Sequence, residues 1–200
     1  MDMAVDQTGA GDRRSTRLSS GGGKRPRWQA VGSWGLTSLS DLSDPHQRAW
    51  LARRRCGCIV TAGGQLLAIH GRWWPYRGNL LRSAWDARYG GLPEDECELY
   101  YHQPLATPSF LTLSYVHAGE GTSLTTLYTA GLVLDEIARL KRADAIVSHV
   151  TNGRISDRLL ARWGWEPHCL NWHGRHFIKR FYGRYPELAS HWRRRLTLEP

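Results

Sequence analysis

The sequence has few of the features that mark membrane or secreted proteins. No apolar run approaches the roughly twenty residues that cross a bilayer. The N-terminus has Asp2 and Asp6 where a secretory signal needs a basic start followed by an apolar stretch. The four cysteines are too few for a dense disulfide scaffold, and without an export signal we expect them to stay reduced. These absences predict a cytoplasmic protein that does not bind membranes.

The cysteine spacing is also a poor match to a metal site. Cys56 and Cys58 are separated by a single residue, whereas a zinc knuckle has two residues between its paired ligands. The other sulfur and imidazole candidates, Cys169 and His173, lie far along the chain. We therefore predict no metal site.

Residues 1–27 lack the apolar content that a folded segment needs. They contain a run of three glycines, scattered serine and threonine, and a single leucine. Such a segment buries too little surface to offset the entropy lost on ordering, so we expect it to be disordered. The chain of 200 residues is 41% hydrophobic, which is enough for one core, and we expect residues 28–200 to form a single domain.

Basic residues are concentrated at the two ends of the chain. Residues 1–27 hold six basic and three acidic residues, and residues 171–200 hold seven basic and two acidic ones, so the ends carry most of the net charge of +9. Basic ends can contact nucleic acid or a phosphorylated ligand, and they can equally be solvated surface. The ten tryptophans pack in a core or stack on bases, and core packing is the commoner use.

Turn and cap residues divide the chain into alternating strands and helices. Asp44 and Pro45 predict a helix start that continues to about Ala52. Gly63 and Gly64 predict the turn of a hairpin between residues 58 and 70. The other predicted elements are a long irregular segment over 73–95, strands over 96–103, 110–117 and 145–150, helices over 122–142 and 155–163, a hairpin of 169–172 with 175–182, and a basic helix over 187–196.

The segment from Ser109 to His168 determines the fold class. A strand, a helix and a second strand within about forty residues predict a parallel crossover unit whose helix packs on the sheet. We expect an α+β fold, α/β/α sandwich-like, with a mixed, mostly antiparallel twisted sheet and one parallel β-α-β crossover. The loop before the helix, Gly119 to Ser123, presents backbone amides at a helix N-terminus, where an anion can bind.

The order of these elements resembles the GNAT superfamily of acyl-CoA-dependent N-acyltransferases over roughly residues 50–182. Sequences of that family commonly have Arg or Gln three residues before a Gly-x-Gly or Gly-x-Ala loop, a strand that ends near Asn, and a helix that closes in Tyr-x-x-x-Gly-Phe. The matching segments here are Val116-His-Ala-Gly119-Glu-Gly121, Val150-Thr-Asn152 and Arg162-Trp-Gly164-Trp165.

Three positions depart from the family pattern. Val116 stands where the family has Arg or Gln, and Glu120 adds a negative charge where a pyrophosphate would lie. Leu160 occupies the position of a Tyr that is often assigned as the proton donor to the leaving thiolate. That role has no matching residue in this sequence.

The resemblance implies an N-acyltransferase that moves an acetyl or similar group from acetyl-CoA, or another acyl-CoA, to an amine. In that chemistry a base takes the amine proton, and the candidates are a water and His117, which lies at a strand end beside the predicted loop. The residues that it implies for binding the cosubstrate are Val116, Gly119, Gly121, Thr122, Ser123 and Asn152.

Plainer interpretations of these residues stay open. Paired glycines in a loop are more often turn residues than a phosphate cradle, and a lone histidine is more often a hydrogen-bonded bystander. Glu98, Tyr100 and His102 face either the same cleft or solvent. The alternative function is a noncatalytic GNAT-like binding module that contacts nucleic acid or a protein partner through its basic C-terminal region.

Overall fold

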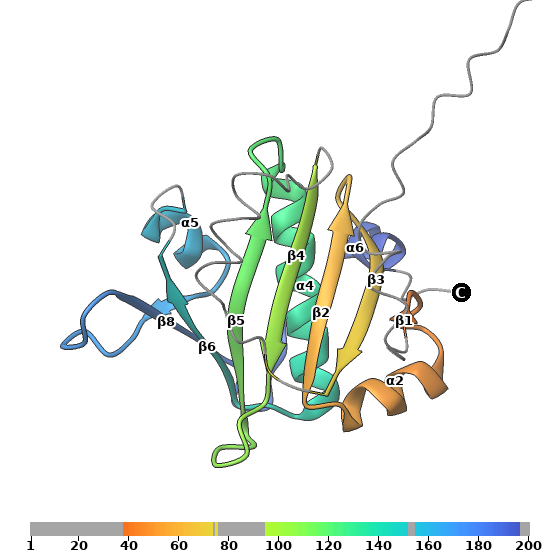
Figure 1. Cartoon of the computed structure of the whole chain (residues 1–200), viewed down its shortest axis with the longest axis horizontal. Coiled ribbons are helices and arrows are strands. Elements are labelled where there is room, and N and C mark those ends of the chain that lie inside the picture. Colours follow the sequence, from red (N-terminus) through yellow and green to blue (C-terminus); the bar gives the residue numbers. More distant parts are fainter. Residues whose placement is uncertain (1–37, 74, 76–94, 152–154, 197–200) are drawn as a thin grey trace, which may run out of the picture.

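The computed structural model describes residues 38–73, 75, 95–151 and 155–196. Within these ranges, eight strands form one sheet in the order β1-β3-β2-β4-β5-β6-β8-β7 (Figure 1). The pair β5–β6 is parallel and the other neighbouring pairs are antiparallel. The predicted α+β class, with a mixed and mostly antiparallel sheet and one parallel crossover, is confirmed, whereas the three-layer arrangement stays a prediction.

The N-terminal elements follow the predicted turn and cap chemistry. The Asp44 side chain accepts a hydrogen bond from the His46 amide at 2.8 Å, with Pro45 in the first helical turn. Gly63 and Gly64 have φ values of 56° and 72°, which glycine adopts without steric cost in a tight turn. The elements are β1 (Ser38–Leu39), α2 (Pro45–Arg53), β2 (Cys56–Ala62) and β3 (Gln65–Arg72).

The crossover unit is the centre of the fold. Ser123 caps the long helix by accepting a hydrogen bond from the Thr126 amide at 3.1 Å. Arg142 ends the helix in the left-handed conformation, with φ of 54°. The elements are β4 (Glu96–His102), β5 (Phe110–Ala118), α4 (Leu124–Lys141) and β6 (Ala145–Val150).

The C-terminal elements are α5 (Asp157–Arg162), β7 (Glu166–Pro167), β8 (Arg175–Arg180) and α6 (Ser190–Arg195). Gly164 has φ of 82° and follows α5 at the point where the predicted helix over 155–163 ends. The predicted strand over 169–172 is wrong: β7 lies earlier in the chain, and Cys169 has a left-handed φ of 51° that interrupts an extended segment. The final helix is shorter than predicted because Ala189 has an extended backbone, with φ of -60° and ψ of 150°, so the helix begins only at Ser190.

Helix α4 covers one face of the sheet and forms the core with it (Figure 1). Its fully buried side chains include Val133 and Ile137, which pack with Ile59 and Ile146 from the strands. A buried ion pair also joins α4 to β8, with Nζ of Lys179 at 2.5 Å from Oδ2 of Asp135. Burial raises the pKa of Asp135 above its ordinary value although Lys179 opposes the shift.

Several predictions fall on parts of the chain outside the described residues. They are the predicted disorder of residues 1–27, the predicted irregular segment over nearly all of residues 73–95, and the predicted cosubstrate contact of Asn152. Among the described helices, none combines the length and the apolar character that a membrane span requires.

Two glycines, one in β3 and one in α4, allow the packing around them to be tested. A Cβ atom at Gly71 would lie 2.1 Å from the Trp50 ring, whereas a Cβ atom at Gly131 in α4 would meet nothing within 4 Å. We expect Gly71→Ala to lower the free energy of unfolding by about 1–3 kcal/mol through overpacking. Gly131→Ala should raise it by about 0.5–1 kcal/mol because alanine favours a helix. Urea denaturation measures both changes, and equal stability of the two variants would contradict this packing.

Candidate functional site

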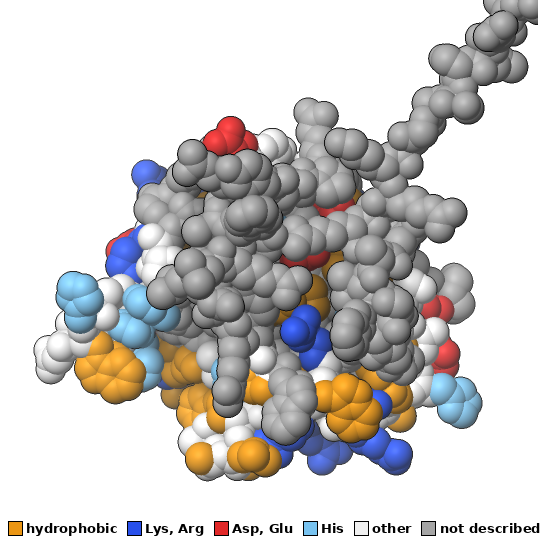
Figure 2. All heavy atoms as spheres, viewed as in Figure 1, with side chains coloured by type: hydrophobic (Ala, Val, Ile, Leu, Met, Phe, Trp, Pro, Cys, Tyr) orange, Lys and Arg blue, Asp and Glu red, His pale blue; other side chains and the backbone are white. Residues whose placement is uncertain are grey.

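The sheet face opposite α4 carries a cluster of polar side chains. Glu96, Glu98 and Tyr100 alternate along β4 with Leu99 and Tyr101, which belong to the core with α4. Glu96 is 2% exposed and Glu98 is 8% exposed, so neither carboxyl group is a solvated surface charge. Figure 2 shows acidic side chains in the middle of this face, over the central strands. Buried carboxyl groups are costly without partners, so the cluster needs a chemical explanation.

Strand register brings residues from four strands together on this face. Glu98 lies opposite His117 of β5. Tyr100 lies opposite Cys58 of β2, which in turn lies opposite His70 of β3. Directly opposite residues on neighbouring strands have Cβ atoms about 5 Å apart, so these side chains form continuous rows across the sheet.

Glu98 is the centre of a small network on these rows. Its Oε2 atom accepts a hydrogen bond from the Tyr100 hydroxyl at 2.8 Å and lies 3.7 Å from Nδ1 of His117. The side chains of His117 and Glu98 are 17% and 10% exposed, which shields the pair from water. A carboxylate beside one ring nitrogen favours the proton on that nitrogen and leaves the other, Nε2, as an acceptor. The arrangement can therefore take a proton from a bound group.

Other polar atoms on the same face have no hydrogen-bond partner within the described residues. They are Oε1 of Glu96, Nε2 of His70 and Nε of Arg72. Burial raises the pKa of Glu96, and the Glu98 charge adds to that effect. Burial also lowers the pKa of His70, which favours its neutral ring. These groups are available to a polar ligand, since a buried polar atom is costly until it is hydrogen-bonded.

The α4 N-terminus is occupied by a carboxylate from the chain itself. Oδ1 of Asp95 accepts a hydrogen bond from the Ser123 amide at 2.7 Å. Burial opposes ionisation of Asp95, but hydrogen bonds from Ser123, Thr126 and Gly63 outweigh it and lower the pKa below the ordinary value. An anion at a helix N-terminus is stabilised by the amides and the helix dipole. Here the chain supplies that anion.

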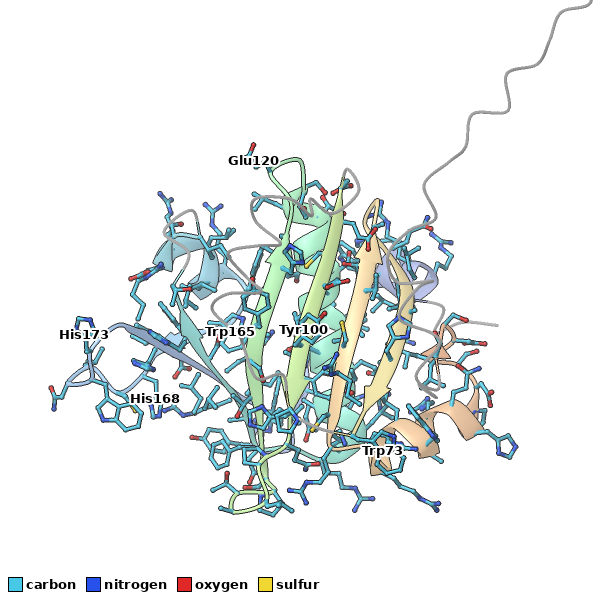
Figure 3. All side chains as sticks on the ribbon, in the orientation of Figure 1. Trp73, Tyr100, Glu120, Trp165, His168 and His173 are labelled. Atoms are coloured by element: carbon cyan, nitrogen blue, oxygen red, sulfur yellow. The ribbon has the colours of Figure 1, made fainter. Side chains whose placement is uncertain are left out.

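The loop that the sequence assigned to pyrophosphate is mainly structural at its C-terminal end. The Thr122 amide donates to the Gly119 carbonyl at 3.2 Å, and the Thr122 hydroxyl donates to the Glu96 carbonyl at 2.7 Å. Gly119 and Gly121 are not among the glycines with positive φ. Glu120 is exposed and points away from the protein at the loop tip (Figure 3).

The predicted site residues thus fall into three groups. His117 faces the polar cluster, whereas Val116 points to the other side and packs against the core. Gly119, Gly121, Thr122 and Ser123 build the loop and the helix cap. The sequence did not single out Asp95, His70 or Arg72, because their neighbours come from other strands and no local pattern marks them.

The environment of the cysteines does not favour a role as nucleophiles. Cys56, Cys58 and Cys97 are buried, and Cys169 is partly buried. Burial raises the pKa of Cys97 to about 12, and it raises the pKa of Cys58 in the same direction. These two thiols are therefore protonated near neutral pH and are poor nucleophiles. Within the described residues, no group of three or more His, Cys, Asp or Glu side chains is arranged to hold a metal ion.

Comparison with known proteins does not assign the chain to a family. No protein-family model, curated protein or solved structure matches it. The roles of the polar cluster therefore follow from its own geometry and chemistry.

Asp95 can be tested through its charge. We expect Asp95→Asn to lower the free energy of unfolding by about 0.5–1 kcal/mol at neutral pH, because the helix N-terminus loses its anion. The folded-state pKa of Asp95 lies below the ordinary 3.8, so its contribution is complete above that pH and is lost as the pH falls through the folded value. Urea denaturation at neutral pH and at about pH 3 should show the difference from wild type shrinking on acidification.

Glu120→Gln is the control, since Glu120 is an exposed carboxylate in the β5–α4 loop, three residues before the Ser123 amide that Asp95 contacts. It should leave the stability unchanged at both pH values. A loss as large as that of Asp95→Asn would show that general loop charge, and not the bonded carboxylate, stabilises the helix start.

Proposed function

We propose that the protein is an N-acyltransferase that moves an acetyl or similar group from an acyl-CoA thioester to an amine. The observation that carries this proposal is the divergence of β5 from β6 beside the Glu98–His117 pair. The end of β5 can then bind an extended thioester next to His117, which accepts a proton.

The parallel ladder between β5 and β6 is short. It joins residues 110–113 of β5 to residues 145–148 of β6 and then stops, although β5 continues to Ala118. Figure 1 shows the two strands spreading apart beyond this point. Backbone groups of a strand alternate between its two sides, so the end of β5 directs donors and acceptors toward the side that β6 has left.

This strand end suits the extended part of a CoA thioester. That part contains amide groups, which can pair with a strand edge as an added strand does. The pairing of β4 with β5 has a register shift between Tyr100 and Tyr101, at the point along β5 where the β5–β6 ladder ends. Ser114 lies there and its hydroxyl is 2.7 Å from Nδ1 of His102. Such bulges bend a strand and redirect its side chains.

The pair of His117 and Glu98 supplies the acid–base chemistry. The amine nitrogen attacks the thioester carbonyl carbon, the C–S bond breaks, the CoA sulfur leaves as a thiolate, and the amine proton passes to Nε2 of His117. Glu98 stabilises the resulting imidazolium from the Nδ1 side. General-base catalysis of this kind contributes about 10²–10⁴-fold to a rate.

The phosphate groups of CoA fit the α4 N-terminus only in part. The Ser123 amide already donates to Asp95, and the Thr122 amide donates to Gly119. Within the described residues, the amides of Gly121, Leu124 and Thr125 make no hydrogen bond and are the ones that can face a phosphate. Asp95 places a negative charge at the α4 N-terminus, so we expect weaker phosphate binding than at a free helix N-terminus.

Binding is tested with acetyl-CoA and the purified full-length chain. At about a hundred times its dissociation constant, the ligand should stabilise the native state by roughly 2.7 kcal/mol. For a chain of this size the melting temperature should rise by about 5–10 °C. If acetyl-CoA gives no shift, the thioester proposal is wrong, and the noncatalytic binding module becomes the better hypothesis.

Catalysis is tested by thiol release from acetyl-CoA with a panel of primary amines. We expect His117→Gln to lower the rate by about 10²–10⁴-fold while the acetyl-CoA melting shift is kept. Glu98→Gln should lower the rate less and shift its pH profile, since it acts through His117. His46→Gln, an exposed histidine on α2, is the matched control and should keep the full rate. A His117→Gln variant as active as this control would refute the assigned base.

A further inference from the structure

Aromatic and basic side chains gather at the end of the molecule where α2 and α4 both terminate. We call this the basic aromatic surface and define it by Trp50, Arg53, Arg54, Trp73 and Arg142. The two helix ends are tied together, because Nζ of Lys141 donates to the Ala52 carbonyl at 3.0 Å and to the Arg54 carbonyl at 2.5 Å. Figure 2 shows hydrophobic and Lys/Arg side chains along this lower edge, and Figure 3 shows Trp73 there beside α2.

A layered stack forms the centre of the basic aromatic surface. The guanidinium carbon of Arg54 lies 4.9 Å from the Trp50 ring centroid and 4.5 Å from the Trp73 ring centroid. Trp50 keeps its place across β3 because Gly71 has no side chain to displace it. Trp73 is nevertheless 72% exposed. The stack thus holds one large ring in position with much of its surface open to solvent.

The charges around the stack are mostly positive. Arg53 and Arg142 are exposed at the helix ends. Residues 45–53 and the loop over 103–109 contain no acidic residue, and Asp144 is an exposed carboxylate that follows Arg142. Cations favour helix C-termini, which explains their presence here. Stabilisation of a helix end by cations does not explain why Trp73 stacks on Arg54 while most of its ring is exposed.

Other cations at this end have a structural role and are not available to a ligand. The Arg55 guanidinium donates to the Gln103 carbonyl at 3.2 Å and to the Pro104 carbonyl at 2.7 Å. Lys141 is bound to the end of α2, and burial lowers its pKa to about 8. Among the described residues at the ends of α2 and α4, Arg53 and Arg142 are exposed cations.

We propose that the basic aromatic surface binds single-stranded nucleic acid. A base stacks on the open face of Trp73, and the flanking phosphates lie against Arg53 and Arg142. Stacking platforms with nearby cations are the usual means of binding single strands without sequence preference. A duplex keeps its bases stacked inside and cannot offer one to Trp73. The proposal does not depend on acyl transfer.

Binding is measured by fluorescence anisotropy of a short labelled oligo(dT) on the full chain over a series of salt concentrations. Trp73→Ala should weaken binding about tenfold, since a base–aromatic stack is lost. Arg53→Gln and Arg142→Gln should each lower the salt dependence of the affinity by about one counterion. A duplex of the same length should bind more weakly than the single strand.

Trp172→Ala is the matched control, because Trp172 is an exposed tryptophan, 64% accessible, in the loop before β8. It should bind as the wild type does. Replacing Arg193, Arg194 and Arg195 of α6 by Gln tests the competing basic helix. The proposal is overturned if Trp73→Ala and Trp172→Ala bind equally well, if duplex and single strand bind alike, or if only the α6 variant loses binding. Circular dichroism melting of each variant confirms that it is folded.

Discussion

Burial of α4 against the centre of the sheet is the constraint on which the rest of the structure depends. The helix connects β5 to β6 and thereby makes them the parallel pair. Its Thr126 hydroxyl accepts the Gly64 amide at 2.8 Å, which holds the β2–β3 turn, and Lys141 caps the end of α2. A helix with so many buried side chains fixes both the order of the strands and the positions of the elements around them.

A second consequence of this packing is that the two faces of the sheet differ in chemistry. One face is apolar because α4 covers it, so the alternate residues of each strand are free to be polar. On β4 this gives Leu99 and Tyr101 on one side and Glu98 and Tyr100 on the other. The buried carboxyl groups cost stability, and residues that cost stability are retained at sites of function more often than elsewhere.

The two proposed sites use different parts of the same frame. The β5–α4 loop, with Glu120 at its tip, and Trp73 lie at opposite ends of the sheet in Figure 3. The polar cluster beside that loop is largely shielded and suits chemistry that must exclude water. Trp73 is exposed and suits a partner that arrives from solution. Because Asp95 already occupies the α4 N-terminus, the strand end and not the helix end carries the proposed catalytic chemistry.

The sequence by itself determined the features that depend on near neighbours in the chain. Asp44 and Ser123 cap their helices, Gly63 and Gly64 turn the hairpin, and Gly164 ends α5, because such hydrogen bonds and φ values are local. Periodicity also placed α4 between two strands. These signals predicted the mixed sheet with its one crossover and located His117 at the end of a strand.

Tertiary structure decided which distant residues meet. Glu98 faces His117, Asp95 reaches Ser123, and Trp73 stacks on Arg54 only after the strands have paired in one register. A shift of one residue would turn each strand's side chains to the opposite face, so no local pattern specifies these contacts. The strand over 169–172 failed for the same reason, since pairing with β8 selected Glu166–Pro167 instead.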